Sequence, residues 1–510
     1  MADQVVPSIS TLDSSVPPMS IPIKLVTSEI ASIDSNVATS GSQTIFELPQ
    51  RPGVSINPQA CYMTFLLDLP QAQSLDGTCE SLIDSVRIET SAGQTIEECR
   101  AYGATSHMIW KGCADSGCHS HNIISQGGIS DDPIFTEANS TDGKRRYVVT
   151  FNELGFMSMN RSFPLFALPG GIRIIIRWVP NANDAIFASS GTASFAISET
   201  RLFVEELHNT PEYVDSVLKN IVSSGINFVY QCWSNSVIPI TGTSNGGMRV
   251  SSNIRDPQAV MCAIRLNSDR SITKKYMTTT RQSTITRLGF SVDGERFPSS
   301  EIRCDSANQD VTDAYSRLMR AYSRTGMTTT GTLFDPLQYS FATKTMSFIV
   351  TAVGTEALAL VTISTDAAKW LVKYMGNNCN TGISIPVTGN GFITNDTMNV
   401  AMVITAINIS TGVCTTATTN AASSSAVSGT VGDTTLIITA ANLNSGKGVI
   451  YGELLSPTAH SVDTESFISS GPKKSIDVNY QSDVMSASQL YTHVLHKRVM
   501  IIKEDGVSCE

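Results

Sequence analysis

The sequence predicts an all-β protein with two well-marked helices, and three observations lead to this prediction. Short strand-like runs follow one another through most of the 510 residues, and Gly, Pro, Asn and Asp separate them. Hydrophobic residues make up 41% of the chain, enough for a large buried core, whereas charged residues make up only 16%. Two segments, which begin near Thr210 and Asp310, instead repeat their apolar residues at helical spacing.

The expected strands alternate apolar and polar residues or are rich in β-branched residues. In 172–179, Arg173 and Arg177 share one face by the two-residue period, while Ile174 and Trp178 share the other. We expect the arginines on a wet or contacting face and the apolar side chains inside. The expected strands are 43–48, 61–68, 82–90, 146–151, 172–179, 193–206, 226–233, 259–266 and 284–292.

The clearest helix begins after Thr210, a favourable N-cap, with Pro211 at its first position. Gly225 stands where a helix commonly ends in a left-handed residue. The helix carries one apolar stripe, which must pack on something, so we expect a docked connector and a domain boundary here. The stripe consists of Val214, Val217, Leu218, Ile221 and Val222.

The second helix shares its sequence context with an earlier segment. It begins after Asp310, ends before Gly326 and follows a strand and an Asp-Gly turn. An earlier strand, a Ser-Ala-Gly turn and a candidate helix containing Tyr102 come in the same order within 83–110. The repeat suggests an internal duplication of ~200 residues, with chance similarity as the alternative.

Two further segments differ in composition from the rest. Residues 1–40 are rich in Ser, Pro, Val and Ile and carry one lysine against four acidic residues, so we expect an extended arm. The segment 343–448 is poor in charge, with none from Thr397 to Gly432, and we expect an insertion with its own β structure. Such a neutral surface suits an outer face or a contact between subunits. The predicted organisation is therefore an arm at 1–40, a first domain at 41–208, a connecting helix at 209–225, and a second domain at 226–510 that contains this insertion.

Charge and targeting features exclude several classes of function. The formal net charge of −10 argues against a protein that mainly coats phosphate backbones. The apolar stretch 346–364 contains Glu356 and many β-branched residues, so we expect two strands and no transmembrane segment. The first residues lack a basic start and an apolar core, so we expect no signal peptide. Eleven scattered cysteines in a long chain are expected to be reduced and buried.

The sequence contains only weak signals for a metal site or an active site. Four metal-capable residues lie within nine positions, but a structural zinc site usually takes two separated pairs, so we expect a polar surface loop. No G-x-S-x-G motif is present, and the P-loop-like stretch 445–448 lacks its upstream glycine, so it is expected to be a hairpin turn. We therefore predict no catalytic, cofactor-binding or metal residues and no enzyme activity. The four metal-capable residues are Cys113, Cys118, His119 and His121.

Basic and aromatic residues also have ordinary structural explanations. The short basic runs are expected at solvated strand ends or turns, with contact to packaged DNA as the lesser alternative. The aromatic residues Tyr230, Trp233 and Tyr322 are expected in the core rather than in a ligand site. The basic runs are 144–146, 274–275, 473–474 and 497–498.

The order of features resembles the double jelly-roll major capsid proteins of virophages and polinton-like viruses, relatives of the adenovirus hexon lineage. Four segments carry the resemblance, by pattern and order: 163–184, 201–225, 297–326 and 475–506. It implies two eight-stranded antiparallel β-sandwiches, a connecting helix and a β-rich insertion in the second sandwich.

The resemblance also implies a function. Such chains form homotrimers that serve as pseudo-hexameric capsomers, tile an icosahedral shell around a DNA genome, and contact penton and minor capsid proteins. The arm would lie inside the shell, the insertion would be an outward loop, and assembly would take place in the host cytoplasm or nucleus, with no cofactor. The alternatives are a single-jelly-roll coat protein with a projecting domain, a cell-surface adhesin, or a carbohydrate-active β enzyme with a carboxylate pair.

Overall fold

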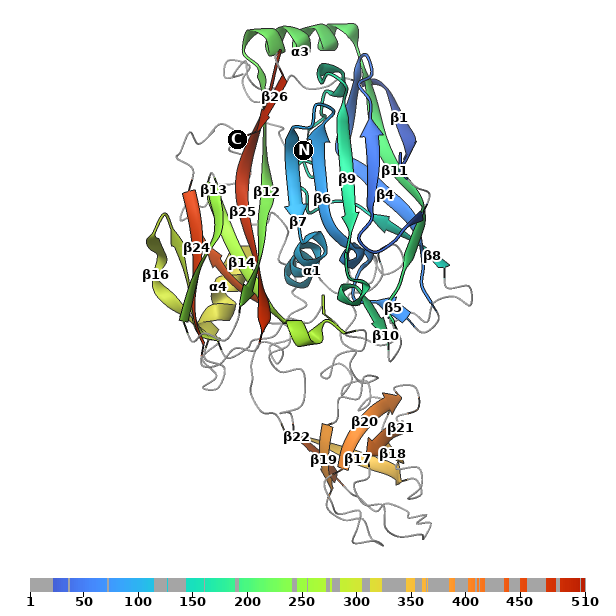
Figure 1. The fold of residues 1–510 in the computed structure, drawn as a ribbon, viewed down its shortest axis with the longest axis vertical. Coiled ribbons are helices and arrows are strands. Elements are labelled where there is room, and N and C mark those ends of the chain that lie inside the picture. The colour runs from blue at the N-terminus through green and yellow to red at the C-terminus, as the bar shows by residue number, and fades with distance from the viewer. Residues whose placement is uncertain are drawn as a thin grey trace, which may run out of the picture.

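A computed structural model of the chain shows two β-sandwiches, three α-helices and a small barrel among the residues that it describes (Figure 1). The described residues are 22–34, 37–70, 73–113, 126, 144–159, 161–188, 192–240, 245–254, 256–271, 276–277, 285–304, 312–322, 345–353, 360–363, 365, 385–389, 402–408, 411, 413–417, 435–439, 450–455, 474–482, 487–504 and 506–509.

The first sandwich consists of two antiparallel sheets with strand orders β1-β11-β4-β8 and β3-β9-β6-β7. Numbered along the chain, its eight main strands pair as 1-8-3-6 and 2-7-4-5, which is the jelly-roll arrangement. These strands are β1 (Pro22–Ala31), β3 (Gln43–Leu48), β4 (Val54–Asp68), β6 (Ile83–Thr90), β7 (Thr95–Arg100), β8 (Lys144–Val149), β9 (Ile172–Trp178) and β11 (Ala196–Asn209). The short strands β2 (Val37–Ala38), β5 (Gln73–Leu75) and β10 (Ile186–Ala188) lie at its margins.

The second sandwich repeats this pairing without a change. Its sheets have the orders β12-β25-β14-β23 and β13-β24-β15-β16, which are again 1-8-3-6 and 2-7-4-5 in chain order. The strands are β12 (Ile226–Ile240), β13 (Asn245–Ile254), β14 (Pro257–Leu266), β15 (Ile285–Val292), β16 (Glu295–Arg303), β23 (Ile450–Leu454), β24 (Lys474–Ser482) and β25 (Ser488–Lys503), with β26 (Gly506–Cys509) beside the end of β25. The chain is thus a double jelly roll, and the alternative of a single jelly roll with a projecting domain is wrong.

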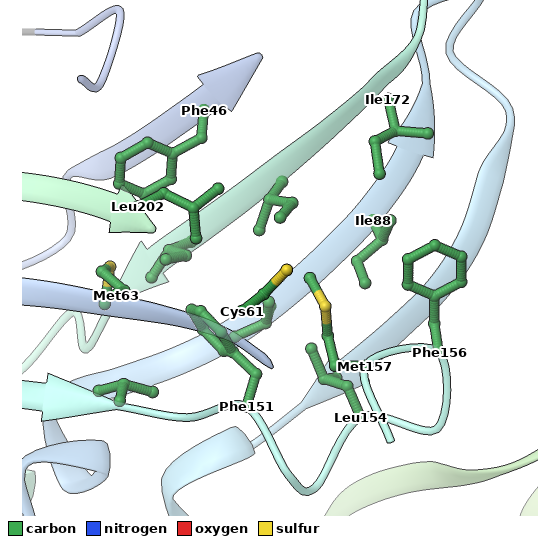
Figure 2. Close-up of a cluster of buried hydrophobic side chains, with 14 of the residues drawn as sticks. Phe46, Cys61, Met63, Ile88, Phe151, Leu154, Phe156, Met157, Ile172 and Leu202 are labelled. Carbon is green, nitrogen blue, oxygen red and sulfur yellow. The ribbon is translucent and has the colours of Figure 1, made fainter. Parts of the chain in front are cut away.

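Alternation along the strands builds the core of each sandwich. In β9, Ile174 and Trp178 are buried while Arg177 is exposed, as the two-residue period predicts. Figure 2 shows how side chains from both sheets of the first sandwich meet, with Phe46 and Ile172 from one sheet facing Met63 and Leu202 from the other. Full burial of aliphatic and aromatic side chains, each worth about 1.5–3 kcal/mol, stabilises both sandwiches.

The connecting helix is α3 (Pro211–Ser223), as the capping residues predict. The hydroxyl of Thr210 accepts a hydrogen bond from the backbone of Tyr213, and Gly225 has a φ of 76°, which favours glycine. One part of the prediction is wrong, because Leu218 and Val222 are 43% and 64% exposed. Among the described residues, only the Val217 side of the stripe is covered.

The other two helices occupy equivalent places. α1 (Tyr102–Cys113) follows β7, and α4 (Thr312–Tyr322) follows β16, so each comes directly after the fifth strand of its own sandwich. The repeated order of signals therefore corresponds to a repeated topology. The capping residues expected for α4, Asp310 and Gly326, lie outside the described residues.

The segment 343–448 contains six strands that pair into a closed antiparallel barrel. The stretch expected to be two strands supplies β17 and β18, and in the described chain no helix is long and apolar enough to cross a membrane. Figure 1 shows the barrel at the end of the molecule opposite α3. Its strands are β17 (Thr345–Val353), β18 (Leu360–Ile363), β19 (Ile385–Gly389), β20 (Met402–Asn408), β21 (Val413–Ala417) and β22 (Thr435–Thr439).

The segment 1–40, expected as an extended arm, contributes a strand to the first sandwich. Residues 22–31 form β1, which pairs along its length with β11, and Glu29 forms an ion pair with Arg201 at 2.9 Å. Residues 26, 28 and 30 turn toward the sandwich, and Ile30 packs on its core. The preceding residues, 1–21, lie outside the described part of the chain.

Candidate functional site

The junction between the two sandwiches brings together the buried and polar side chains considered below, and the part nearest α3 is apolar. Phe228 and Tyr230, near the start of β12, belong to the same buried cluster as the core of the first sandwich. The ring of Phe163 lies 5.5 Å from that of Phe228, and the ring of Phe156 lies 6.5 Å from that of Tyr230. Both phenylalanines come from the 150–164 connection after β8. The two sandwiches therefore share a core rather than touching through a wet surface.

A glycine makes this close approach possible. A Cβ atom at Gly155 would lie 1.7 Å from the carbonyl oxygen of Gln231, so no other residue fits without a shift of the backbone. The neighbouring amides are fixed from the other side, since the carboxylate of Glu97 accepts hydrogen bonds from the backbone of Gly155 at 2.9 Å and of Phe156 at 2.7 Å.

The lower part of the junction contains the helix α1. Met108 and Ile109 of α1 belong to the buried cluster of the second sandwich, and the hydroxyl of Tyr322 donates a hydrogen bond of 2.8 Å to the carbonyl of Met108. The aromatic residues Tyr230, Trp233 and Tyr322 are all buried in these clusters, as expected.

A polar network crosses the junction between α1 and the strands β12 and β25. The amide nitrogen of Asn235 donates to the carbonyl of Arg100 at 2.5 Å and to the hydroxyl of Thr105 at 3.0 Å. The Nδ1 atom of His493 lies 3.0 Å from both the Thr105 hydroxyl and the Asn235 carbonyl oxygen. Burial, together with the nearby charge of Arg265, lowers the pKa of His493 to about 3, so this imidazole is neutral.

A cavity of about 520 Å³ lies at the junction, and charged side chains that form ion pairs line it. Nε of Arg270 lies 3.1 Å from a carboxylate oxygen of Asp184, and Asp76 accepts a hydrogen bond of 2.6 Å from the backbone of Met277. Burial raises the pKa of Asp184 to about 6, against the opposing effect of Arg270. The cavity walls carry three arginines and three carboxylates, so neither sign of charge dominates the cavity. They are Arg100, Arg177, Arg270, Asp84, Glu98 and Asp184.

A cysteine and a histidine lie together in a smaller hollow nearby. The Sγ atom of Cys232 is 3.3 Å from Nε2 of His496. Burial raises the pKa of the Cys232 thiol well above its ordinary value and lowers the pKa of His496 to about 4. A nucleophilic cysteine needs the opposite, an easily formed thiolate beside a protonated base. The pair therefore packs as neutral groups.

Buried carboxylates form a further cluster that the sequence did not indicate. Tyr102 and Ser106 donate hydrogen bonds to Glu153 at 2.5 and 2.9 Å. Burial, and then the charge of Glu153, raises the pKa of Glu80 to about 8, and burial raises that of Glu97 to about 7. These carboxyl groups are buried, unlike the open carboxylate pair of a glycosidase.

The candidates named from the sequence are not brought together. Cys113 is the last residue of α1, and Cys118, His119 and His121 lie outside the described residues, as does the 445–448 stretch. Within the described part of the chain, no group of three or more His, Cys, Asp or Glu side chains could hold a metal. The seven cysteines whose side chains the structure describes are free thiols, and all of these except Cys509 are buried.

The basic runs within the described residues are largely paired with carboxylates. On β8, Lys144 lies 3.7 Å from Asp68, and Arg146 forms an ion pair with Glu199. On β25, Lys497 lies 3.4 Å from Asp256. Exposed pairs of this kind stabilise little, but they leave no concentrated positive surface on these strands.

Comparison of the structure with solved structures finds similar proteins, whereas comparison of the sequence does not. No family model matches the sequence, and no curated protein matches it. The chain is similar to a chain in the 3.5 Å cryo-EM structure of the Sputnik virophage, with a TM-score of 0.51 at 9% identity, over 97% of this chain and 89% of that one. It also aligns with the PBCV-1 virus capsid (TM-score 0.46, 9% identity, 96% and 97% covered) and with the mavirus major capsid protein (TM-score 0.44, 11% identity, 100% and 95% covered). The Sputnik match, which extends over almost the whole chain, supports the double jelly-roll fold.

Proposed function

We propose that this chain is the major capsid protein of a virus, a structural subunit that trimerises into pseudo-hexameric capsomers and tiles an icosahedral shell around a DNA genome. The observation that carries the proposal is the repetition of one jelly roll within one chain, with the two copies joined by a shared core. Two similar sandwiches in each of three chains supply six similar corners. A tile of that shape packs on a hexagonal lattice.

The chemistry of the junction supports a structural role rather than an enzymatic one. The acids Glu80, Glu97 and Glu153 are buried, the Cys232–His496 pair is neutral, and Lys144, Arg146 and Lys497 of the basic runs are paired with carboxylates. With a net charge of −10, the chain is not expected to bind the genome strongly, so other proteins or ions would neutralise the DNA.

The proposed organisation assigns a role to each part of the chain. The segments 41–208 and 226–510, the first completed by β1, form the wall of the shell, with 209–225 as their connector and the insertion 343–448 as an outward projection. The rest of the 1–40 segment, ahead of β1, ties neighbouring capsomers or binds minor capsid proteins. We propose penton proteins as further partners, a location in the virion, and assembly in the host cytoplasm or nucleus.

Light scattering on the purified chain, with negative-stain imaging of the same fraction, tests the proposal. The expected result is a mass near three chains and particles of triangular to hexagonal outline. Obligate interfaces bury about 2,000–5,000 Å², so the trimer should persist on dilution. A folded protein that stays monomeric over a wide range of concentration would overturn the proposal.

A further inference from the structure

The helix α3 carries an apolar stripe that is exposed at one end of the molecule. Figure 1 shows α3 lying across the ends of both sandwiches. Its inner side is buried through Tyr213, Val217 and Ile221. On its outer side, Leu218 and Val222 lie one turn apart and are 43% and 64% exposed in the described structure. Exposed apolar side chains that gather in one place commonly mark a contact site.

The start of β1 adds apolar surface beside the start of this helix. Pro22 pairs with Asn209, the residue just before Thr210, which caps α3. The first two large apolar side chains of β1, Ile23 and Leu25, are 68% and 55% exposed. Of the seven large apolar side chains that are exposed in the described residues, four therefore lie on α3 or at the start of β1.

The segment 1–21 is joined to the fold at this same place. Because β1 begins beside the start of α3, the residues ahead of Pro22 enter the strand from the end of the sandwich that α3 covers. A chain of 21 residues can extend to about 70 Å, whereas the 13 residues of α3 form a helix about 20 Å long. The segment is therefore long enough to follow the helix from its first turn to its last.

The composition of this segment suits an apolar face. After Met1 it contains seven large apolar residues and only two charged side chains, Asp3 and Asp13. Docking on an apolar stripe would therefore remove few charges from water. The covalent link to β1 also keeps the segment at a high effective concentration around α3. The seven apolar residues are Val5, Val6, Ile9, Leu12, Val16, Met19 and Ile21.

We infer that the segment 1–21 docks on the exposed stripe of α3 in its own chain and covers Leu218 and Val222. The inference goes beyond the proposed function, because it concerns a contact within one chain and does not require the capsomer. It also gives the segment a binding site before assembly. The tie between capsomers proposed above would then form when neighbouring copies exchange this contact, which is a low-cost route to association between identical chains.

Cysteine labelling tests whether the segment covers the stripe. The variant Val222→Cys places a thiol on the stripe, and its reaction with a maleimide is followed at that site by peptide mass spectrometry. We expect this reaction to be several-fold faster when residues 1–21 are removed. We expect the same increase in a full-length chain that carries Ile9→Ser/Leu12→Ser/Val16→Ser, which tests the inference even if the shortened chain does not fold. An unchanged rate at position 222 in both chains would overturn the inference.

A thiol on the second sandwich is the control for labelling. Glu295→Cys lies at an exposed position of β16 and should react at the same rate with and without residues 1–21. Circular dichroism and thermal melting check that each chain is folded. A faster reaction at both positions would show general loosening of the fold, and it would contradict a specific cover on α3.

Photo-cross-linking identifies what covers the stripe. A benzophenone maleimide attached at Lys219→Cys, an exposed site beside Leu218, should link on irradiation to a peptide from residues 1–21 and give a product with the mass of one chain on a denaturing gel. A product of two chains that contains this peptide would show that the segment of a neighbouring copy covers the stripe. A product that joins two α3 peptides would show a direct contact between two copies. Either outcome would contradict the inference, as would the absence of any link to residues 1–21.

These experiments separate the failure of the inference from the failure of the proposed function. A natural chain that is monomeric by light scattering contradicts the capsomer, but a link from α3 to residues 1–21 of the same chain would still support the inference. A natural chain that is trimeric, with no such link and no change in labelling at position 222, leaves the capsomer in place and rejects the docking of the segment.

Discussion

The phenol of Tyr322 on α4 donates a hydrogen bond of 2.8 Å to the backbone carbonyl of Met108 on α1. Both residues are buried, and each lies on the helix that follows the fifth strand of its own sandwich. The bond therefore joins two topologically equivalent helices across the junction. A buried hydrogen bond of this kind contributes about 0.5–1.5 kcal/mol, so this contact helps to hold the two sandwiches in their relative orientation.

Replacing Tyr322 with phenylalanine keeps the ring and removes only this donor. We expect the Tyr322→Phe variant to fold and to lose about 0.5–1.5 kcal/mol of unfolding free energy, since one buried hydrogen bond is removed. Urea denaturation followed by tryptophan fluorescence measures the change. The control is Tyr62→Phe, on a half-buried ring that stacks on Phe203, and it should change stability by less than about 0.5 kcal/mol. Equal stability of Tyr322→Phe and the natural chain would refute this prediction.

Gly155 tests how tightly the sandwiches must approach. We expect Gly155→Ala to separate the 150–164 connection from β12, because the new methyl group would overlap the carbonyl of Gln231. Overpacking of this kind costs about 1–3 kcal/mol or more, and the loss should appear as a lower thermal midpoint and as greater proteolysis near the junction. Gly289→Ala on β15 is the control, because its Cβ would make only an ordinary contact of 3.6 Å with Glu301.

The sequence predicts best those features that depend on near neighbours. The cap of α3 involves Thr210 and Tyr213, three positions apart, and the alternation of Arg177 and Trp178 needs only the two-residue period of a strand. Both are confirmed. The sequence does not predict that β1 belongs to the first sandwich, because β1 pairs with β11, about 180 residues further on. The segment that contains β1 is rich in Ser and Pro, which is typical of an extended arm.

The buried polar sites could not be predicted for the same reason. Nothing beside Glu97 shows that it will be buried, since the amides that it binds belong to Gly155 and Phe156, 58 and 59 positions away. Helical periodicity places Leu218 and Val222 on the apolar stripe of α3, but only the packing shows that the described part of the chain leaves them exposed. The periodicity of a sequence shows which face of a helix or strand is apolar. Whether that face is buried depends on which other part of the fold packs against it.

The buried acids predict that stability falls toward alkaline pH. The pKa of Glu80 rises from 4.5 to about 8 on folding, so the folded chain holds more protons than the unfolded chain between these values. The contribution of Glu80 is therefore greatest at acid pH and is lost as the pH rises toward about 8. We expect Glu80→Gln, which stays neutral, to reduce this decline, as measured by denaturation midpoints from pH 5 to about pH 9. Glu98→Gln, on the partly exposed side of β7, is the control and should leave the decline unchanged.

The two buried histidines are expected to affect stability in the opposite direction to Glu80, because they lower the stability of the folded chain at acid pH. His493 and His496 titrate near 6.5 when unfolded, but their pKa values in the folded chain are about 3 and about 4. At these two histidines the unfolded chain therefore takes up more protons between about pH 4 and pH 6.5, and their contribution to the stability of the folded state is lost as the pH falls through this range. Arg265 beside His493 and Arg498 beside His496 strengthen the effect, since each opposes a second positive charge.

Replacing the histidines separates their effect on the pH dependence of stability from the effect of the carboxyl groups. The double variant His493→Gln/His496→Gln cannot take up these protons, so its denaturation midpoint should rise relative to that of the natural chain as the pH falls from about 6.5 to about 4. His208→Gln is the control, because this side chain is 41% exposed at the edge of β11 and should leave the slope unchanged. Above about pH 6.5 the histidines no longer contribute, and both chains should show the same alkaline decline from Glu80 and Glu97. An unaltered acid slope in the double variant would show that these imidazoles do not control the stability of the junction.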